Sequence, residues 1–102
     1  MLSIIIPCYN DKDLQRTIDD IRVKAGGDIE TIAVLDGFHQ EVRDAKVLEN
    51  VKQVGMRASV NNGIAASKGE WLMKCDAHCV FDKDFDVKVL SNIEKNWIVI
   101  PR

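Results

Sequence analysis

The sequence has no hydrophobic run near the roughly 20 residues that a transmembrane helix needs, and no signal peptide precedes its first apolar segment. It also lacks a basic block of the kind that binds nucleic acid, since its 14 basic and 16 acidic residues are mixed along the chain. Neither glycine-rich phosphate loop, GxGxxG or GxxxxGK[ST], occurs. These absences predict a cytoplasmic protein with no nucleic-acid partner, no membrane span and no dinucleotide-type or P-loop site.

Cysteine is scarce and odd in number. The three cysteines, Cys8, Cys75 and Cys79, do not suit a disulfide framework. Cys75, His78 and Cys79 are ligand types that zinc prefers. However, no second ligand pair exists elsewhere in the sequence, and Cys75 falls inside a predicted buried strand. A structural zinc site is therefore not favoured.

The 102 residues, of which 46% are hydrophobic, suffice for one domain with a packed core. Short apolar runs predict strands at Leu2–Cys8, Thr31–Leu35, Glu70–Cys75 and Trp97–Ile100, with a weaker signal at Lys46–Leu48. Helical spacing predicts helices through Leu14 to Ala25, Arg57 to Ser67 and Phe85 to Ile93, the last capped by Asp82. The polar segment from Phe38 to Ala45 reads as a brief helix or a loop. This alternation predicts an α/β fold, a Rossmann-like, mostly parallel sheet with flanking helices.

Several turn residues carry a local prediction. Asn10 or Asp11 is expected to cap the first helix, because short polar side chains satisfy the first helical N–H groups. Gly26 and Gly27 are expected to end that helix in the left-handed conformation. Gly63 lies inside a predicted helix at a cost of about 1 kcal/mol relative to alanine, which predicts a close backbone contact there.

Polar residues follow three of the predicted strands: Pro7-Cys8-Tyr9-Asn10, Leu35-Asp36-Gly37 and Asp76-Ala77-His78. The carboxyl ends of neighbouring parallel strands meet at one crevice. They would bring together an aromatic ring, two carboxylates and an imidazole, a set that suits a nucleotide diphosphate with a divalent cation. Taken alone, the spacing favours Asp76 as a turn cap and His78 as an incidental loop residue, and it is the combination at three strand ends that favours a metal site.

These segments resemble a known family. SIIIPCYND, the strand closing in Asp36-Gly37, GMRASVNNGIAASKGEW and CDAHC look like the nucleotide-sugar-binding half of a family 2 glycosyltransferase of the GT-A fold. The resemblance runs from Leu2 to Arg102. Asp76 to Cys79 is similar to the DxH motif of polypeptide N-acetylgalactosaminyltransferases, a related group. It implies transfer of a sugar from a nucleotide diphosphate donor, commonly UDP-linked, to a hydroxyl acceptor.

The resemblance also implies roles for individual residues. Pro7, Cys8, Tyr9 and Asn10 match the first-strand motif that lines the base and ribose pocket, with Tyr9 placed to stack on uracil. Asp36 matches the second acid of a DDG-type strand end, and Asn61 belongs to the second motif. Asp76 and His78 match the metal motif and would hold Mn²⁺ or Mg²⁺ against the two phosphates.

The sequence departs from the family pattern at three positions. Leu35 stands where the first acid of DDG usually lies. Val60 replaces the usual arginine before Asn61. Arg57, one turn earlier on the same helix face, is either a contact to the phosphates in its place or a solvated surface arginine. Lys74 lies where the family is usually apolar, so its ammonium group must find water or a carboxylate.

A whole GT-A domain is about twice as long as residues 1–102. The chain is therefore expected to be the nucleotide-sugar-binding domain of a truncated enzyme, with the general base and acceptor half outside it. The alternative is a non-catalytic partner-binding or regulatory module of the same fold. In either case an uncovered sheet edge would favour self-association into a homo-oligomer.

Overall fold

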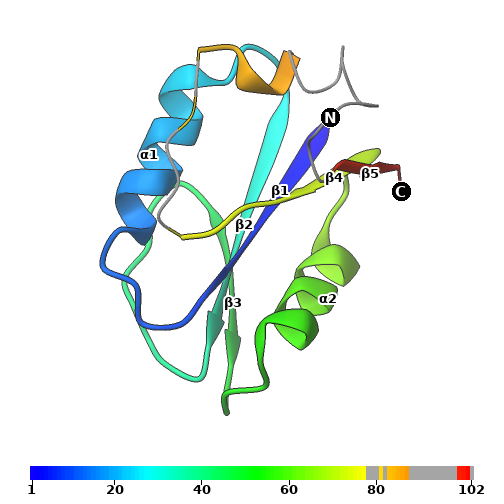
Figure 1. Ribbon diagram of the computed structural model, residues 1–102. Coiled ribbons are helices and arrows are strands. Elements are labelled where there is room, and N and C mark those ends of the chain that lie inside the picture. The colour runs from blue at the N-terminus through cyan, green and yellow to red at the C-terminus, as the bar shows by residue number, and fades with distance from the viewer. Residues whose placement is uncertain (78–80, 82, 88–98, 102) are drawn as a thin grey trace.

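A computed structural model describes residues 1–77, 81, 83–87 and 99–101 of the chain. In chain order its elements are β1 (Leu2–Cys8), α1 (Leu14–Lys24), β2 (Ile29–Asp36), β3 (Lys46–Asn50), α2 (Met56–Ala66), β4 (Trp71–Lys74) and β5 (Val99–Pro101). The strands form one sheet in the order β3-β2-β1-β4-β5, in which only β5 runs antiparallel to its neighbour. The predicted α/β fold with a mostly parallel sheet is confirmed (Figure 1).

β1 is the central strand, and all seven of its residues are buried. The chain moves outward from β1 through β2 to β3, then returns to add β4 on the other side of β1. The strand order therefore reverses at β1, and ligands of open parallel sheets bind at such a reversal, beyond the carboxyl ends of the strands. Cys8 pairs with Leu35, so β1 and β2 end at nearly the same level.

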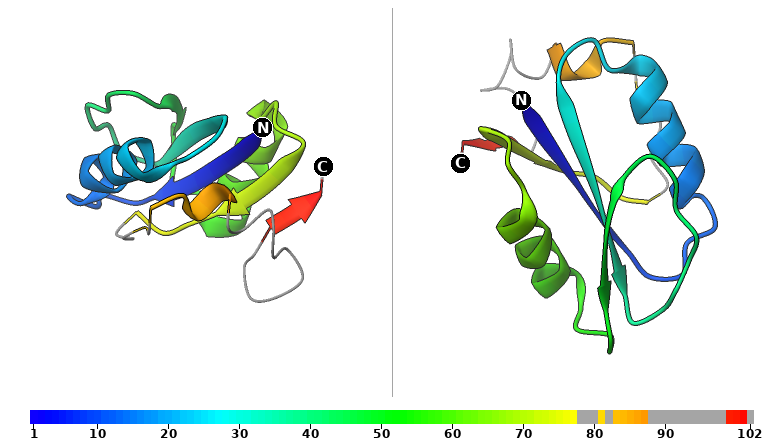
Figure 2. Two further views of the ribbon diagram at one scale, coloured as in Figure 1. Left: turned by 90° about the horizontal axis from the view of Figure 1, so that it is seen from above. Right: turned by 180° about the vertical axis from the view of Figure 1, so that it is seen from behind.

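Helices α1 and α2 cover opposite faces of the sheet (Figure 2). On one face, Leu14, Ile18 and Ile21 of α1 join a large core cluster with even-numbered β1 residues such as Ile4 and Ile6. On the other face, Ile5 packs with residues of β2 and β4, and Ile64 of α2 covers them. This division follows from the alternation of side chains along a strand.

Gly63 explains how closely α2 approaches the sheet. A Cβ atom at this position would lie 2.5 Å from Cγ2 of Ile5 and 3.3 Å from Cγ2 of Val34. Only a residue without a side chain fits there, so the predicted close contact at Gly63 is confirmed. It holds the carboxyl-terminal half of α2 against Ile5, in the middle of β1, and against Val34 of β2.

The predicted cap of α1 is wrong. The N-cap residue is Asp13, not Asn10 or Asp11, and its side chain makes no capping hydrogen bond. Oδ1 of Asp11 instead accepts a hydrogen bond from the Asp13 N–H at 2.9 Å, and Asn10 has a φ of 52°. The turn after β1 therefore uses both residues to redirect the chain before the helix begins.

The predicted end of α1 is also wrong in mechanism. The helix ends at Lys24, and its C-cap Ala25 is extended rather than left-handed. The N–H groups of Gly26 and Gly27 donate to the two carboxylate oxygens of Asp86 at 2.7 and 2.8 Å. A side chain on Gly26 would collide with Asp84. These glycines thus serve the close approach of residues 84–86.

The remaining predictions have mixed outcomes. The segment from Phe38 to Ala45 is a loop, tied to α1 because the Gln15 side chain exchanges hydrogen bonds with the Arg43 backbone at 2.8 and 3.2 Å. β3 extends to Asn50, two residues beyond its prediction. Of the predicted helix through Phe85 to Ile93, residues 88–93 lie outside the described part of the chain, as does its expected cap Asp82. Among the described residues, no helix is long and apolar enough to cross a membrane.

Candidate functional site

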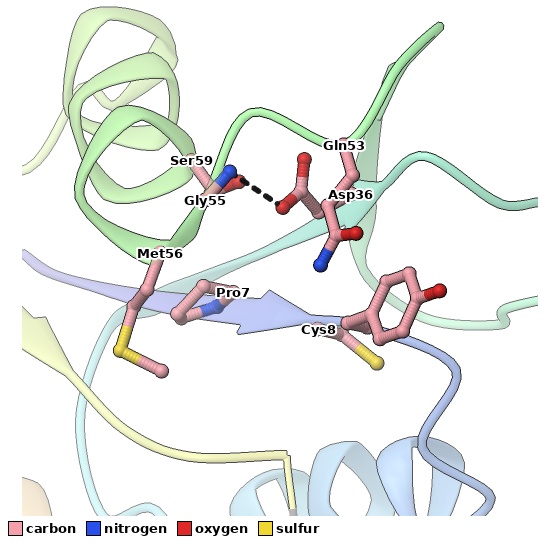
Figure 3. A pocket seen from close by; sticks show the side chains of 8 residues that line it. Pro7, Cys8, Asp36, Gln53, Gly55, Met56 and Ser59 are labelled. Atoms are coloured by element: carbon pink, nitrogen blue, oxygen red, sulfur yellow. Dashed lines mark hydrogen bonds between the residues drawn. The ribbon is translucent and has the colours of Figure 1, made fainter.

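A pocket of about 200 Å³ opens at the carboxyl edge of the sheet, between the ends of β1 and β2 and the start of α2 (Figure 3). It is lined by Pro7, Cys8, Tyr9, Asp36, Gln53, Gly55, Met56 and Ser59. Four of the predicted site residues therefore come together, although Pro7 to Tyr9 and Asp36 are far apart in the sequence. The other four lining residues come from the connection between β3 and α2 and from α2 itself.

Asp36 closes the inner wall of this pocket and is only 4% exposed. Its Oδ1 atom accepts hydrogen bonds from the Val54 N–H at 2.8 Å and the Asn50 side chain at 3.0 Å. Its Oδ2 atom accepts one from the Gly55 N–H at 2.9 Å (Figure 3). The carboxylate thus fixes the loop that leads into α2.

These bonds decide the charge of Asp36. Burial works to raise the pKa of its carboxyl group, but hydrogen bonds from Val54, Asn50, Gly55 and Ser59 outweigh burial and hold the pKa below its usual value of 3.8. Asp36 is therefore ionised at neutral pH. Because a carboxylate has about four acceptor positions, little of its capacity is left for a ligand.

Tyr9 forms the opposite, solvent-facing side. Its side chain is 60% exposed. The Phe38 ring meets it edge to face, with ring centroids 6.0 Å apart. This contact orients the tyrosine while leaving ring surface uncovered. An exposed, oriented aromatic ring beside a pocket is suited to stacking on a flat ligand group.

Cys8 contributes an apolar wall between these two residues. It is 4% exposed and belongs to the core cluster on the α1 face. Burial raises the pKa of its thiol above the usual value of 9.0, against a lowering effect of a backbone hydrogen bond from Asp11. The group is therefore a neutral thiol at physiological pH. A buried neutral thiol packs as a small hydrophobe and is not a nucleophile.

Three other predicted residues do not line the pocket. Asn10 follows Tyr9 and is exposed. Arg57 and Asn61 are exposed on α2, one turn apart, and neither borders the cavity. Arg57 nevertheless follows the lining residue Met56 directly, so it lies in the first helical turn beside the pocket mouth. Their nucleotide-binding roles stay predictions.

Asp76 follows β4 at the same edge of the sheet. The Cys75 N–H donates to the Ile5 carbonyl at 3.0 Å, which carries the parallel pairing one residue beyond β4 and leaves Asp76 beside the end of β1. The Asp76 side chain is 52% exposed, and its Oδ1 lies 3.9 Å from Nζ of Lys74. The predicted need of Lys74 for a carboxylate is met here.

Of the two predicted metal ligands, Asp76 lies in the described part of the chain. His78 lies outside the described residues, and within the described residues no three His, Cys, Asp or Glu side chains gather as a metal site. The exposed carboxylate of Asp76 is a hard oxygen ligand. Mg²⁺ and similar ions bind through one or two such carboxylates together with substrate phosphates. Asp76 therefore fits the predicted cation as one ligand.

Sequence reasoning missed Gln53, Gly55, Met56 and Ser59. The signal that could have found them is the position of β3, which runs parallel to β2 and pairs Asn50 with Asp36. Any connection leaving β3 must then begin at the carboxyl edge, beside the site. Because the strand signal at Lys46–Leu48 is weak, the sequence did not predict that this connection lies beside the site.

The geometry agrees with the comparisons with known proteins. The sequence profile described as glycosyl transferase family 2 matches residues 3–102. The chain belongs to this family. An uncharacterised glycosyltransferase of Haemophilus influenzae is 32% identical over 104 residues, which cover 94% of this chain and 35% of that protein.

Solved structures share the fold. The mannosyltransferase PcManGT from Pyrobaculum calidifontis, in complex with GDP-Man and Mn²⁺, matches 89% of this chain with a TM-score of 0.74 and 16% identity. Staphylococcus aureus TarS 1-349, in complex with UDP-GlcNAc, matches 92% with a TM-score of 0.72 and 17% identity. This family 2 chain therefore has the Rossmann-like α/β architecture of GT-A glycosyltransferases.

The family 2 chain spans about one third of the proteins it matches, namely 35% of the Haemophilus relative, 32% of PcManGT and 31% of TarS 1-349. The matched third contains β1, β2 and α2, the elements that carry the pocket.

Proposed function

We propose that this chain is the nucleotide-sugar-binding portion of a glycosyltransferase that takes a UDP-type donor with Mn²⁺ or Mg²⁺ and serves sugar transfer to a hydroxyl acceptor. The observation that carries the proposal is the pocket itself. An exposed aromatic ring, Tyr9, borders a cavity at the carboxyl edge of the sheet. A solvent-exposed carboxylate, Asp76, follows β4 at the same edge. The nucleotide complexes of PcManGT and TarS, which share this fold, support a donor of this class.

Each side chain then has a defined task. Tyr9 stacks on the base, with Pro7 and Cys8 forming the apolar floor beneath it. Asp36 acts indirectly, because its carboxylate holds the loop and the start of α2 that form the far wall. Arg57, in the first turn of α2, and Asn10 and Asn61 are the proposed polar contacts to ribose and phosphates.

Asp76 and His78 are the proposed metal ligands. A divalent ion bound there would act as a Lewis acid and stabilise the charge of the leaving diphosphate. What this chain itself supplies is an exposed carboxylate at a fixed strand end. The DxH pattern, the identity of the sugar and the acceptor are parts of the proposal.

The test is thermal unfolding of the protein with UDP, with and without Mn²⁺. Ligands that bind only the folded state raise the melting temperature. We expect UDP to raise it in a Mn²⁺-dependent manner, and Asp76→Ala to abolish the Mn²⁺-dependent part. Isothermal titration of UDP into each protein gives the dissociation constants directly.

Asp28→Ala is the matched control. Asp28 is an exposed aspartate immediately before β2, at the amino edge of the sheet and therefore far from the pocket. The same substitution there should leave the UDP response unchanged. If no nucleoside diphosphate shifts the melting temperature with either metal, the proposal is wrong.

One observation favours the alternative of a non-catalytic partner-binding module. β3 is the edge strand on one side of the sheet. Exposed apolar side chains lie within it (Val47, 37% exposed) and directly after it (Val51, 96%, and Val54, 52%). Exposed strands of this kind pair with other chains. Light scattering behind gel filtration would detect self-association, and a strict monomer would count against the predicted homo-oligomer.

A further inference from the structure

The pocket contains several polar groups, but most of them are already engaged. The carboxylate of Asp36 accepts three hydrogen bonds from the chain itself. The hydroxyl of Ser59 accepts one from the Asn50 side chain at 3.1 Å and also interacts with Asp36. Neither group is therefore available to recognise the edge of a ligand ring.

Leu35 cannot take over this task. It stands where the first acid of the DDG-type strand end usually lies, and it is fully buried in the core on the α1 face. Its side chain is apolar and does not line the pocket. The side chains at the end of β2 consequently offer little unused hydrogen-bonding capacity to a base.

Gln53 is a lining residue whose polar side-chain groups are not engaged in this way. Its carboxamide has no hydrogen-bond partner among the residues that the structure describes. Figure 3 shows the side chain passing in front of Asp36, with its amide end directed toward Pro7 and Cys8. It thus presents one donor group and one acceptor at the mouth of the cavity, on the far side from the core.

The backbone of Gln53 is held firmly. A Cβ atom on Gly37, which has a φ of 83°, would lie 2.7 Å from the backbone nitrogen of Gln53, so the two segments are in close contact. The next two residues, Val54 and Gly55, donate their N–H groups to Asp36. A side chain on such a fixed backbone loses less freedom when it binds a ligand.

We propose that the Gln53 carboxamide reads the edge of the nucleobase that stacks on Tyr9. This inference rests on the proposed nucleotide-sugar function. Uracil presents an N3–H donor beside the O4 carbonyl. Oε1 of Gln53 accepts from that N–H, and Nε2 donates to that carbonyl, so the amide pairs with both groups at once.

The experiment compares UDP with N3-methyluridine diphosphate, in which the N–H is blocked. Dissociation constants are measured by isothermal titration in the presence of Mn²⁺. The wild-type protein should bind UDP about tenfold more tightly than the methylated analogue, since a hydrogen bond to a ligand and the partner left unpaired are worth about this factor. Gln53→Ala should reduce this ratio to near one, mainly by weakening UDP binding.

Two further variants make the result decisive. Gln53→Met keeps the length of the side chain and removes both polar groups, so it should behave as Gln53→Ala does. Gln40→Ala makes the same change at a glutamine that does not line the cavity and should keep the tenfold ratio. GDP, whose guanine carries a similar N–H beside a carbonyl, should also lose affinity in the Gln53 variants if the pocket accepts purines.

The outcomes separate the two proposals. If the protein binds UDP and the Gln53 variants keep the preference for UDP over its methylated analogue, Gln53 does not read the base, while the nucleotide-binding function stands. If the wild-type protein binds neither UDP nor GDP with Mn²⁺, both proposals are wrong. Circular dichroism of each variant checks that the fold is kept.

Discussion

The carboxyl ends of β2 and β4 each carry one aspartate, and the structure holds the two side chains in opposite ways. Asp36, at the end of β2, is 4% exposed and accepts three hydrogen bonds from Asn50, Val54 and Gly55. Asp76, beyond β4, has a side chain that is 52% exposed, and its Oδ1 lies 3.9 Å from Nζ of Lys74.

The difference separates an acid that builds the site from one that remains available to a ligand. An exposed ion pair such as that of Asp76 is worth about 0–1 kcal/mol, so a bound cation can replace it at little cost. The bonds of Asp36 cannot be exchanged without releasing the loop before α2. Two aspartates that look alike in the sequence therefore have different roles: Asp36 holds the loop before α2, and Asp76 is available to a ligand.

The largest effect is expected for Asp36→Ala. The substitution leaves the Val54 and Gly55 N–H groups and the Asn50 amide without their acceptor, and it empties a buried position. We expect a loss of about 2–4 kcal/mol in the free energy of unfolding, measured by urea denaturation. Asp36→Asn keeps one carbonyl acceptor and should lose less.

Asp76→Ala is the matched comparison for this measurement. Because that side chain is exposed and, among the described residues, contacts only Lys74, its loss should change the free energy of unfolding by less than about 0.5 kcal/mol. Equal losses for the two variants would remove the distinction between the two strand ends.

A smaller effect, in binding rather than stability, is expected for Lys74→Met. The ammonium group beside Asp76 repels a divalent cation and competes for the same oxygen. Removing it should lower the Mn²⁺ concentration needed for half-maximal UDP binding by about three- to tenfold, since one charge at this distance is worth about 1 kcal/mol near solvent. Titration of Mn²⁺ at fixed UDP, followed by calorimetry, gives this concentration.

Lys68→Met serves as the control, because Lys68 is exposed and lies before β4, at the amino edge. It should leave the Mn²⁺ requirement as it is. A higher requirement in Lys74→Met would mean the reverse relationship, in which Lys74 assists the binding of the diphosphate itself.

The strands were predictable because their signal is local. The run from Leu2 to Cys8 is apolar throughout, and it forms the buried central strand with the predicted bounds. The carboxyl end of α1 was not predictable, because the group that contacts it is remote in the sequence. Gly26 and Gly27 are held by Asp86, about 60 residues away along the chain, and no local rule contains that contact.

The same distinction between predictable and unpredictable features applies to the site. That Pro7, Tyr9 and Asp36 lie at one edge follows from parallel pairing alone. The hydrogen bonds to the Asp36 carboxylate could not be predicted. Their donors belong to Asn50, Val54 and Gly55, whose positions depend on the weakly predicted β3. The assignment of Gln53 to the pocket depends on the same connection.

The smallest effect on stability is expected from the hydrogen bonds of His39, which join the loop after β2 to β3. Nδ1 of His39, in the loop after β2, lies 2.5 Å from Oε1 of Glu49 in β3, and its Nε2 lies 3.3 Å from Glu41. The hydrogen bonds to Glu49 and Glu41 raise the pKa of His39 above its usual value of 6.5. The side chain is 70% exposed, so solvent weakens the pair.

The sign of its pH dependence follows from this raised pKa. The folded state favours the protonated form, so the stabilisation is fully present below about pH 6.5 and is lost as the pH rises through the higher folded value. His39→Gln should therefore lower the melting temperature by about 1–3 °C at pH 6 and have no effect in alkaline solution. Glu49→Gln should show the same profile. If the difference in melting temperature between wild type and variant stays constant with pH, the loop after β2 is held by packing, such as that of Phe38 against Tyr9. Charged hydrogen bonds would then stabilise this edge of the sheet only at Asp36.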